Sequence, residues 1–420
     1  MDPALLVQYG STLLTIALVI GFLMAFGIGA NDVANTMATS VGTNAISVKK
    51  ALIIAAVFEF AGAYLAGGEV TNTIKDNIID TGAYQGMEIK LALGMISALF
   101  ASGAWLIIAS VFGWPVSTTH TIIGSLIGFA LVTTDASSVH WSVIAGIFGS
   151  WIITPAISGL IAYLLFVAIQ RTIFIRFHPF AKAKSMAPYF IALTFFILSI
   201  VTMQNGLKHV GIIISNAESL VLSLIIALIA SVAGAVYLRY KKFPSKKERK
   251  TRYENVERVF TILLIITACA MAFAHGSNDV ANAVGPLAAV AEIVNTGEDE
   301  SLSSAWLLSL GAFGIVLGLA TLGYQVMKTI GTNITHLTPS RGFAAQLATA
   351  TTVVIASGTG LPISTTQTMV GAVMGVGLAR GISAINLSVV RKILVSWVVT
   401  LPAGAVFAVL FYFLMAQIFC

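Results

Sequence analysis

Charged residues are scarce in this chain of 420 residues. Asp, Glu, Lys and Arg make up only 10% of the sequence, whereas 57% of the residues are hydrophobic. A soluble globular domain carries about 25% charged residues. The composition therefore excludes an ordinary soluble protein and indicates an all-α polytopic membrane protein.

Cysteine is almost absent as well. Cys269 lies in an apolar run and Cys420 at the end of the chain, so we expect no disulfide framework and no thiolate metal site. The sequence also lacks a His/Cys cluster with transition-metal spacing, a phosphate-binding P-loop and a hydrolase nucleophile elbow. We expect no enzymatic activity, no ATP hydrolysis and no cofactor. The first apolar run has no basic flank of the signal-peptide type, so we expect it to stay in the mature chain.

Apolar runs of membrane-spanning length are abundant. A span needs roughly 17–25 apolar residues, and the run at 118–133 is short enough to be re-entrant instead. The sequence predicts about twelve transmembrane helices, at 4–26, 50–68, 91–112, 118–133, 141–168, 187–204, 213–238, 259–275, 303–325, 343–359, 364–380 and 388–417.

The basic residues predict an orientation. The net charge of +6 does not indicate nucleic-acid binding, because nine of the 23 Lys and Arg residues lie in 239–258. If 169–186 and 239–258 face the cytoplasm, both termini are outside and most other basic residues fall inside, as the positive-inside rule requires. We expect a multi-pass protein of the plasma (inner) membrane with a basic cytoplasmic linker at 239–258, preceded by a two-helix insertion at 187–238.

Two motifs occur twice at one separation. GANDVANT at 29–36 returns as GSNDVANA at 276–283, and GWPVSTTHTIIG at 113–124 returns as GLPISTTQTMVG at 360–371; both offsets are 247 (276 − 29 and 360 − 113). The chain therefore contains an N-terminal repeat, 1–168, and a C-terminal repeat, 259–420. Seven predicted spans separate the first motifs, so the repeats are expected to be inverted, as in many secondary transporters.

The first motif offers oxygen ligands at membrane depth. Its glycines favour an interruption of the helix, and hard oxygen ligands suit Na⁺. Charged residues at such depth are usually functional. The alternative interpretation is helix capping or hydrogen bonding between helices. The candidate sodium ligands are Asn31, Asp32 and Asn35 in the first copy and Asn278, Asp279 and Asn282 in the second.

The second motif predicts the start of a helix. Proline followed by serine is typical of a helix N-terminus, which makes Ser117 and Ser364 candidate N-caps. Free amides and the positive end of the helix dipole favour an anion there. An ordinary N-cap is the alternative. Two copies would surround a small tetrahedral oxyanion, and the candidate anion ligands are Ser117, Thr118, Thr119, Ser364, Thr365 and Thr366.

The charges of the two motifs suggest that cation and anion move together. Neither motif contains Lys or Arg, and an anion about 4–6 Å from a carboxylate is repelled by several kcal/mol at an effective dielectric near 20. Bound cations would remove this repulsion, which predicts symport. Glu59, inside the second run, is a candidate coupling residue or an inter-helix hydrogen-bond partner. His120 and His275 have no equivalent in the other repeat and are interpreted as structural.

At these motifs the sequence resembles the inorganic phosphate transporter family, of prokaryotic type. The resemblance implies inorganic phosphate as substrate, with Na⁺, H⁺ or a metal–phosphate complex in different members, and it implies functional roles for Asp32, Asp279, Glu59 and the Ser-Thr-Thr residues. Many members have His where this chain has Gln367, and some have Glu at Gln346, which favours Na⁺ as the co-transported ion.

Several alternatives remain open at this stage. A proton-coupled phosphate permease or a sulfate permease would share the fold, and an anion channel would use the same helix termini. A receptor or scaffold would explain neither duplicated motif. The expected partners are phosphate, sodium ions and the lipid bilayer, with no nucleic acid, and the architecture is compatible with a homodimer.

Overall fold

The computed structural model describes residues 2–206, 214–244, 249–294, 304–324, 326–327 and 337–419. Over these residues the chain forms α-helices with short 3-10 and π segments, and the only β pairing described is an isolated bridge between Ile79 and Val139. The expectation of an all-α architecture is confirmed for this part of the chain. Of the basic linker, 245–248 lie outside the described residues.

Wherever they are described, the apolar runs predicted from the sequence lie mainly on helices. The helices are α1 (Asp2–Gly42), α2 (Val48–Ala66), α3 (Gly68–Asp76), α4 (Glu88–Val111), α5 (Thr118–Thr133), α6 (Trp141–Ile169), α7 (Pro179–Val201), α8 (Asn216–Tyr240), α9 (Arg249–Val294), α10 (Ser304–Thr321), α12 (Pro339–Gly358), α13 (Thr365–Leu378) and α14 (Leu387–Phe419).

The predicted number of membrane spans is not confirmed. Within the described residues, eight helices are long and apolar enough to cross a membrane, or nine if α2 and α3, which are bent by 62° at Gly67, form one broken span. Helices α5 and α13 have 16 and 14 residues. At 1.5 Å per residue each is shorter than the ~30 Å hydrocarbon core, so neither crosses a membrane alone.

The expected interruption of the helices at the first motif is wrong. Helices α1 and α9 run unbroken through Gly29 and Gly276. The glycines instead permit close helix crossings: a Cβ atom at Gly29 would lie 1.9 Å from the Ile315 carbonyl oxygen of α10, and one at Gly276 would lie 2.1 Å from the Glu59 carbonyl oxygen of α2. Glycine is therefore required for packing at these two positions, because any Cβ would overlap backbone of the neighbouring helix.

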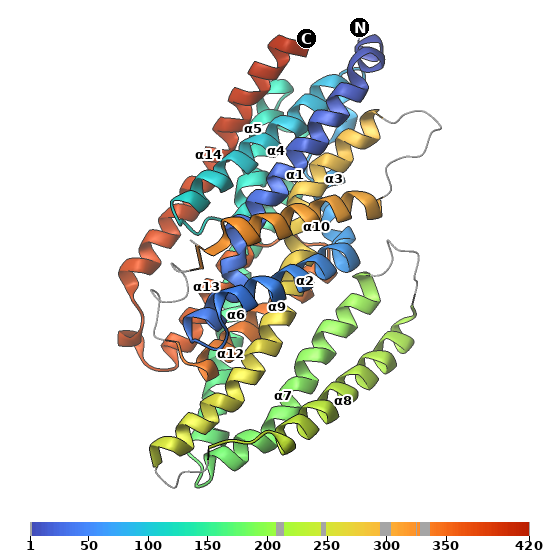
Figure 1. Cartoon of the computed structure of the whole chain (residues 1–420). Helices are drawn as coiled ribbons and strands as arrows, with labels where there is room; N and C mark the ends of the chain where they lie inside the picture. The colour runs from blue at the N-terminus through green and yellow to red at the C-terminus, as the bar shows by residue number, and fades with distance from the viewer. Residues whose placement is uncertain are drawn as a thin grey trace.

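Two helical hairpins approach each other inside the bundle. Figure 1 shows α4 and α5 in the half of the molecule that carries both termini, and α12 and α13 in the other half. The end of α8 and the start of α9, together called the α8–α9 junction, lie at the end opposite the termini. Among the helices long enough to span a membrane, α4 and α9 are the most buried, with 72% of their most apolar 18-residue stretch buried, whereas α7 and α8 are peripheral, with 17%.

Candidate functional site

Helices α5 and α13 begin at the second motif, as the sequence predicts. The Ser117 hydroxyl accepts a hydrogen bond from the His120 amide at 3.2 Å, and the Ser364 hydroxyl accepts one from the Gln367 amide at 3.3 Å. Both serines are therefore N-caps. The preceding glycines, Gly113 and Gly360, have φ of +67° and +71°, a conformation that favours glycine at the turn before each helix.

The two helix N-termini meet in the interior. Thr119 Oγ1 of α5 donates to the carbonyl oxygen of Ile363 at 2.9 Å, and Thr366 Oγ1 of α13 lies 3.3 Å from the carbonyl oxygen of Val116. Each residue of the second bond lies 247 positions from its counterpart in the first. The free amides at both helix N-termini therefore face one small region, with a positive dipole end on each side.

The asparagines of the first motif hold the hairpins in place. Asn31 Nδ2 lies 3.3 Å from Ser110 Oγ of α4, and the Asn278 amide lies 3.1 Å from Ser357 Oγ of α12. These contacts are again related by the offset of 247. All four side chains are buried, so Asn31 and Asn278 position the ends of α4 and α12 within their own halves.

A second pair of asparagines links the two halves. Asn35 Nδ2 of α1 donates to Thr366 Oγ1 at 2.8 Å, and Asn282 Nδ2 of α9 donates to Thr119 Oγ1 at 3.5 Å. The first motif of each copy thus contacts the second motif of the other copy. The sequence predicted that the two motif types share a site, and the structure brings them into direct contact.

The carboxylates of Asp32 and Asp279 both lie at the N-terminus of α13. Asp32 Oδ1 is 3.2 Å from Thr366 Oγ1 and 3.0 Å from Asn35 Nδ2. Asp279 Oδ2 is 3.0 Å from Thr365 Oγ1 and 3.4 Å from Thr118 Oγ1. Both aspartates are about 1% exposed or less, so the threonine hydroxyls contact carboxylates that lie in the protein interior.

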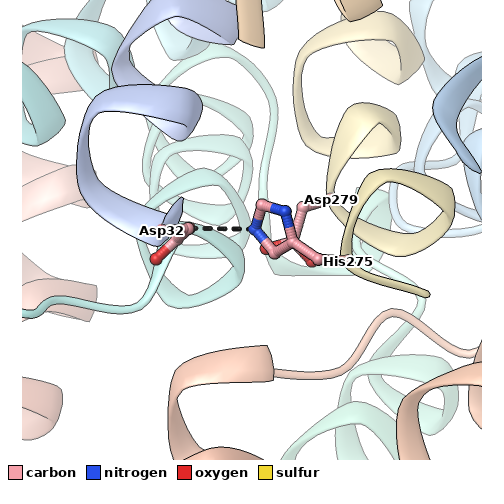
Figure 2. Close-up of side chains that lie close together, drawn as sticks. All are labelled: Asp32, His275 and Asp279. Atoms are coloured by element: carbon pink, nitrogen blue, oxygen red, sulfur yellow. Dashed lines mark ion pairs between the residues drawn. The ribbon is translucent and has the colours of Figure 1, made fainter. Parts of the chain in front are cut away.

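His275 stands between the acidic side chains. Figure 2 shows its ring between Asp32 and Asp279. Nε2 is 3.1 Å from Asp279 Oδ2 and 4.0 Å from Asp32 Oδ2, and Nδ1 is 3.4 Å from Glu59 Oε2. Asp32, His275 and Asp279 each present a ligand atom within 4.8 Å of the others. The interpretation of His275 as a structural residue missed this contact set.

The sequence contained one indication that His275 lies next to an acidic residue. It precedes Asp279 by four residues, which places both side chains on one face of α9. Glu59 is fully buried in α2, as predicted, and its Oε1 accepts from Thr36 Oγ1 at 3.1 Å. Its contact with His275 joins α2 to the acidic cluster, and this contact cannot be read from spacing in the sequence.

His120 and Gln346 lie outside this cluster. The His120 ring stacks on Trp151 with ring centroids 3.7 Å apart, and its Nδ1 is 3.2 Å from the Trp397 carbonyl oxygen. Gln346 of α12 contacts Thr39 Oγ1 and the Thr36 carbonyl oxygen of α1. These two residues connect neighbouring helices, in agreement with the structural interpretation of His120.

The cluster has the chemistry of a cation site next to an anion site. Asp32 Oδ2, Glu59 Oε2 and Asn282 Oδ1 are buried, and apart from the contacts of the two carboxylates with His275 they have no hydrogen-bond partner. Such oxygens are costly in a protein interior unless they are bound. Carboxylate and amide oxygens are the ligands of hard cations. The paired helix N-termini supply amides and hydroxyls for an anion. Within the described part of the chain, no Lys or Arg contributes to this cluster.

The comparisons with known proteins agree on one family. The model of the phosphate transporter family matches residues 28–408. A Haemophilus influenzae protein named "Putative phosphate permease" is 57% identical over 415 residues, which cover 98% of this chain and 99% of that protein. The Arabidopsis thaliana protein named "Inorganic phosphate transporter 2-1, chloroplastic" is 40% identical over 432 residues, covering 96% of this chain and 72% of that protein.

A solved structure named "The sodium-dependent phosphate transporter" has the same fold. It superposes with a TM-score of 0.90 at 40% sequence identity, over 97% of this chain and 100% of that one. The fold and the family model together cover the duplicated motifs and the helices that carry them. This chain is an integral membrane protein and belongs to the phosphate transporter family.

Proposed function

We propose that this chain is a secondary active transporter that carries inorganic phosphate across the membrane together with Na⁺ by alternating access. The observation that carries the proposal is the contact between the two motif types, in which Thr366 joins Asp32 and Asn35 while Thr119 joins Asn282. A cation bound by the acidic helices would lie next to the anion bound by the helix N-termini. The name of the structural neighbour supports sodium as the cation.

The helix N-termini are the proposed phosphate site. A small tetrahedral oxyanion between α5 and α13 would accept hydrogen bonds from amides of both first turns and from threonine hydroxyls. Ser117 and Ser364 already accept a backbone amide, so their own hydroxyl hydrogens remain available as donors. The proposed ligands are the residues of the two Ser-Thr-Thr segments: Ser117, Thr118, Thr119, Ser364, Thr365 and Thr366.

The two acidic motifs are the proposed sodium sites. Their ligands would be Asn31, Asp32, Asn35, Asn278, Asp279 and Asn282. The unpartnered oxygens of Asp32 and Asn282 support this assignment. Bound Na⁺ would offset the repulsion between the carboxylates and phosphate, which amounts to several kcal/mol at about 4–6 Å. Glu59, through its contact with His275, is the proposed coupling residue.

The proposed architecture is a pair of inverted repeats, 1–168 and 259–420, with 187–238 inserted between them. Three observations support it: hydrogen bonds recur at an offset of 247, the two hairpins lie in opposite halves of the molecule (Figure 1), and both termini lie at the end away from the α8–α9 junction. With that junction in the cytoplasm, both termini face the outside of the plasma membrane.

Uptake of radiolabelled phosphate into proteoliposomes tests the function. An imposed inward Na⁺ gradient should drive phosphate to a concentration above that outside, and excess sulfate should not compete. Accumulation with a H⁺ gradient instead would show proton coupling, and equilibration without accumulation would show a channel. Either result would contradict the proposal.

Substitution of the carboxylates tests the sites. Asp32→Asn and Asp279→Asn should remove Na⁺-driven uptake, because each change takes a negative charge from a buried site. Asp135→Asn is the matched control, since Asp135 is exposed in the loop before α6 and should retain full uptake. Wild-type Na⁺ dependence in both aspartate variants would exclude these residues as sodium ligands.

A further inference from the structure

His275, Asp32 and Asp279 form a compact set of donor atoms where the two halves of the chain meet (Figure 2). Asp32 belongs to α1, and the other two residues belong to α9. All three side chains are at most 1% exposed. The ligand atoms that they present lie within 4.8 Å of one another, so a single ion placed among them contacts all three residues.

The ring nitrogens of His275 are not used by hydrogen bonds. Nε2 is 3.1 Å from Asp279 Oδ2 and 4.0 Å from Asp32 Oδ2, and Nδ1 is 3.4 Å from Glu59 Oε2. Despite these distances, neither nitrogen has a partner at hydrogen-bonding geometry within the described residues, and Asp32 Oδ2 has none either. Buried polar atoms without partners are rare and require an explanation. A ligand shared by Nε2 and the two carboxylates supplies one.

The spacing of the donor atoms matches a tetrahedral metal site. Zn²⁺ binds imidazole nitrogen at about 2.0–2.1 Å and carboxylate oxygen at about 2.0–2.2 Å, so two ligand atoms of a tetrahedral site lie about 3.4 Å apart. The distances from His275 Nε2 to the oxygens of Asp279 and Asp32, 3.1 and 4.0 Å, lie on either side of this value. Small shifts of the side chains therefore bring the three donors into coordination geometry.

The imidazole selects the class of ion. Ca²⁺ takes about six to eight oxygen ligands and Mg²⁺ usually keeps several of its waters, whereas imidazole suits Zn²⁺ and other first-row transition metals. A metal-bound histidine almost always directs its other ring nitrogen at a carboxylate or a carbonyl, which fixes the tautomer. Glu59 Oε2 occupies that position here, 3.4 Å from Nδ1. With the proton on Nδ1, the lone pair of Nε2 faces the two aspartates.

We propose that Asp32, His275 and Asp279 bind one divalent transition-metal ion of the Zn²⁺ class, and that Glu59 orients the imidazole. Three protein ligands leave the fourth position of the tetrahedron for water. The ion takes one carboxylate from α1 and one from α9, and so holds these two helices together at the cluster. Because both aspartates are also proposed sodium ligands, the metal and Na⁺ exclude each other; this last point alone rests on the proposed function.

Titration of the purified full-length protein with Co²⁺ tests the site without a transport measurement. Co²⁺ has a visible absorption that is much more intense in tetrahedral than in octahedral coordination, so it reports both binding and geometry. The protein is stripped with a chelator and transferred to metal-free buffer with choline in place of Na⁺. We expect one Co²⁺ ion per chain, with the tetrahedral absorption, and we expect Zn²⁺ to remove it.

Three variants make the test specific. Glu59→Gln leaves all three ligands in place and should weaken Co²⁺ binding by about 10–100-fold while keeping the tetrahedral spectrum. His275→Gln removes a ligand, so it should weaken binding further and abolish that spectrum. His120→Gln is the matched control, because His120 is also buried but stacks on Trp151 outside the cluster, and it should bind Co²⁺ as wild type does.

Three outcomes would overturn the proposal. They are no Co²⁺ binding by the wild-type protein up to millimolar concentration, binding by His275→Gln as tight as that by wild type, and an equal loss in His120→Gln. A metal-free melting curve of His275→Gln that matches wild type shows that lost binding is not lost folding. Asp279→Asn, which keeps the shape of the side chain, gives a second test and should also lose the tetrahedral spectrum.

Exchange of choline for Na⁺ separates this proposal from the proposed function. Na⁺ should raise the apparent Kd for Co²⁺, because both ions need Asp32 and Asp279. Tetrahedral Co²⁺ binding that Na⁺ does not weaken would support the metal site and would contradict the assignment of these aspartates as sodium ligands.

Discussion

Replacing Gly276 by alanine should separate α2 from α9 next to the acidic cluster. A Cβ atom there would lie 2.1 Å from the Glu59 carbonyl oxygen and 3.0 Å from the Ala63 amide nitrogen. Ordinary contact begins at 3.4 Å, so the backbones must separate by about 3.4 − 2.1 = 1.3 Å. The obstructing atoms belong to backbone, so a change of rotamer cannot relieve the overlap.

The expected effect on transport is large. Gly276 adjoins His275, whose Nδ1 is 3.4 Å from Glu59 Oε2, and the same separation moves this pair apart. Displacing a functional group by about 1 Å typically lowers activity about 100-fold. Overpacking also lowers the free energy of unfolding, by about 1–3 kcal/mol. Gly276→Ala should therefore lose almost all Na⁺-driven phosphate uptake and melt at a lower temperature than wild type.

The matched control is Gly146→Ala in α6. A Cβ atom at Gly146 meets no atom within 4 Å, and alanine favours a helix over glycine by about 0.5–1 kcal/mol. This variant should transport as wild type does and melt at the same temperature or slightly higher. Uptake in proteoliposomes and thermal melting in detergent measure both variants. The reasoning is refuted if Gly276→Ala retains wild-type uptake, or if Gly146→Ala loses as much.

Three further substitutions separate the roles of single contacts. Ser364→Ala removes the N-cap of α13 and should lower the free energy of unfolding by about 1 kcal/mol. It should also raise the KM for phosphate, and an unchanged KM would exclude the serine as a ligand. Glu257→Ala removes the acceptor of both the Ser340 amide and hydroxyl, each at 2.8 Å, and should lower stability by about 1–2 kcal/mol, which thermal melting would detect. Glu292→Gln weakens the ion pair with Lys75, in which the Glu292 side chain is 69% exposed. The free energy of unfolding should change by less than about 1 kcal/mol. A larger loss in thermal melting would show that the pair holds α3 against α9.

The helical class and the N-caps were predictable from local sequence. Long apolar runs predict the all-helical class because few backbone structures can span a bilayer. Ser117 and Ser364 are predictable N-caps because each accepts a hydrogen bond from an amide only three residues away. The pairing of distant motifs was predictable as well, since one offset of 247 relates both repeated segments. These inferences depend on short-range chemistry or on the comparison of the chain with itself.

Other features depend on packing between distant segments. The glycines of the first motif predicted a break in α1 and α9, but glycine also permits close helix crossing, and only the position of α10 and α2 decides between the two. His275 was interpreted as a structural residue because it has no equivalent in the other repeat, where Ile28 takes its place. Its contact with Glu59 is made across 216 residues of sequence, 275 − 59, and no local pattern encodes it.

The threonine contacts between the halves have a consequence for how such a site comes into being. Thr119 bonds to the Ile363 backbone, and Thr366 bonds to the acidic helix of the opposite half. Each hairpin thus completes the proposed binding residues of the opposite half, as exchanged segments do in a domain-swapped dimer. If the repeats are inverted, as proposed above, a protein made from one copy of the repeated unit would have to pair with a second molecule inserted upside down in the membrane. Gene duplication makes that encounter intramolecular, and the partner is then present at a fixed, high effective concentration.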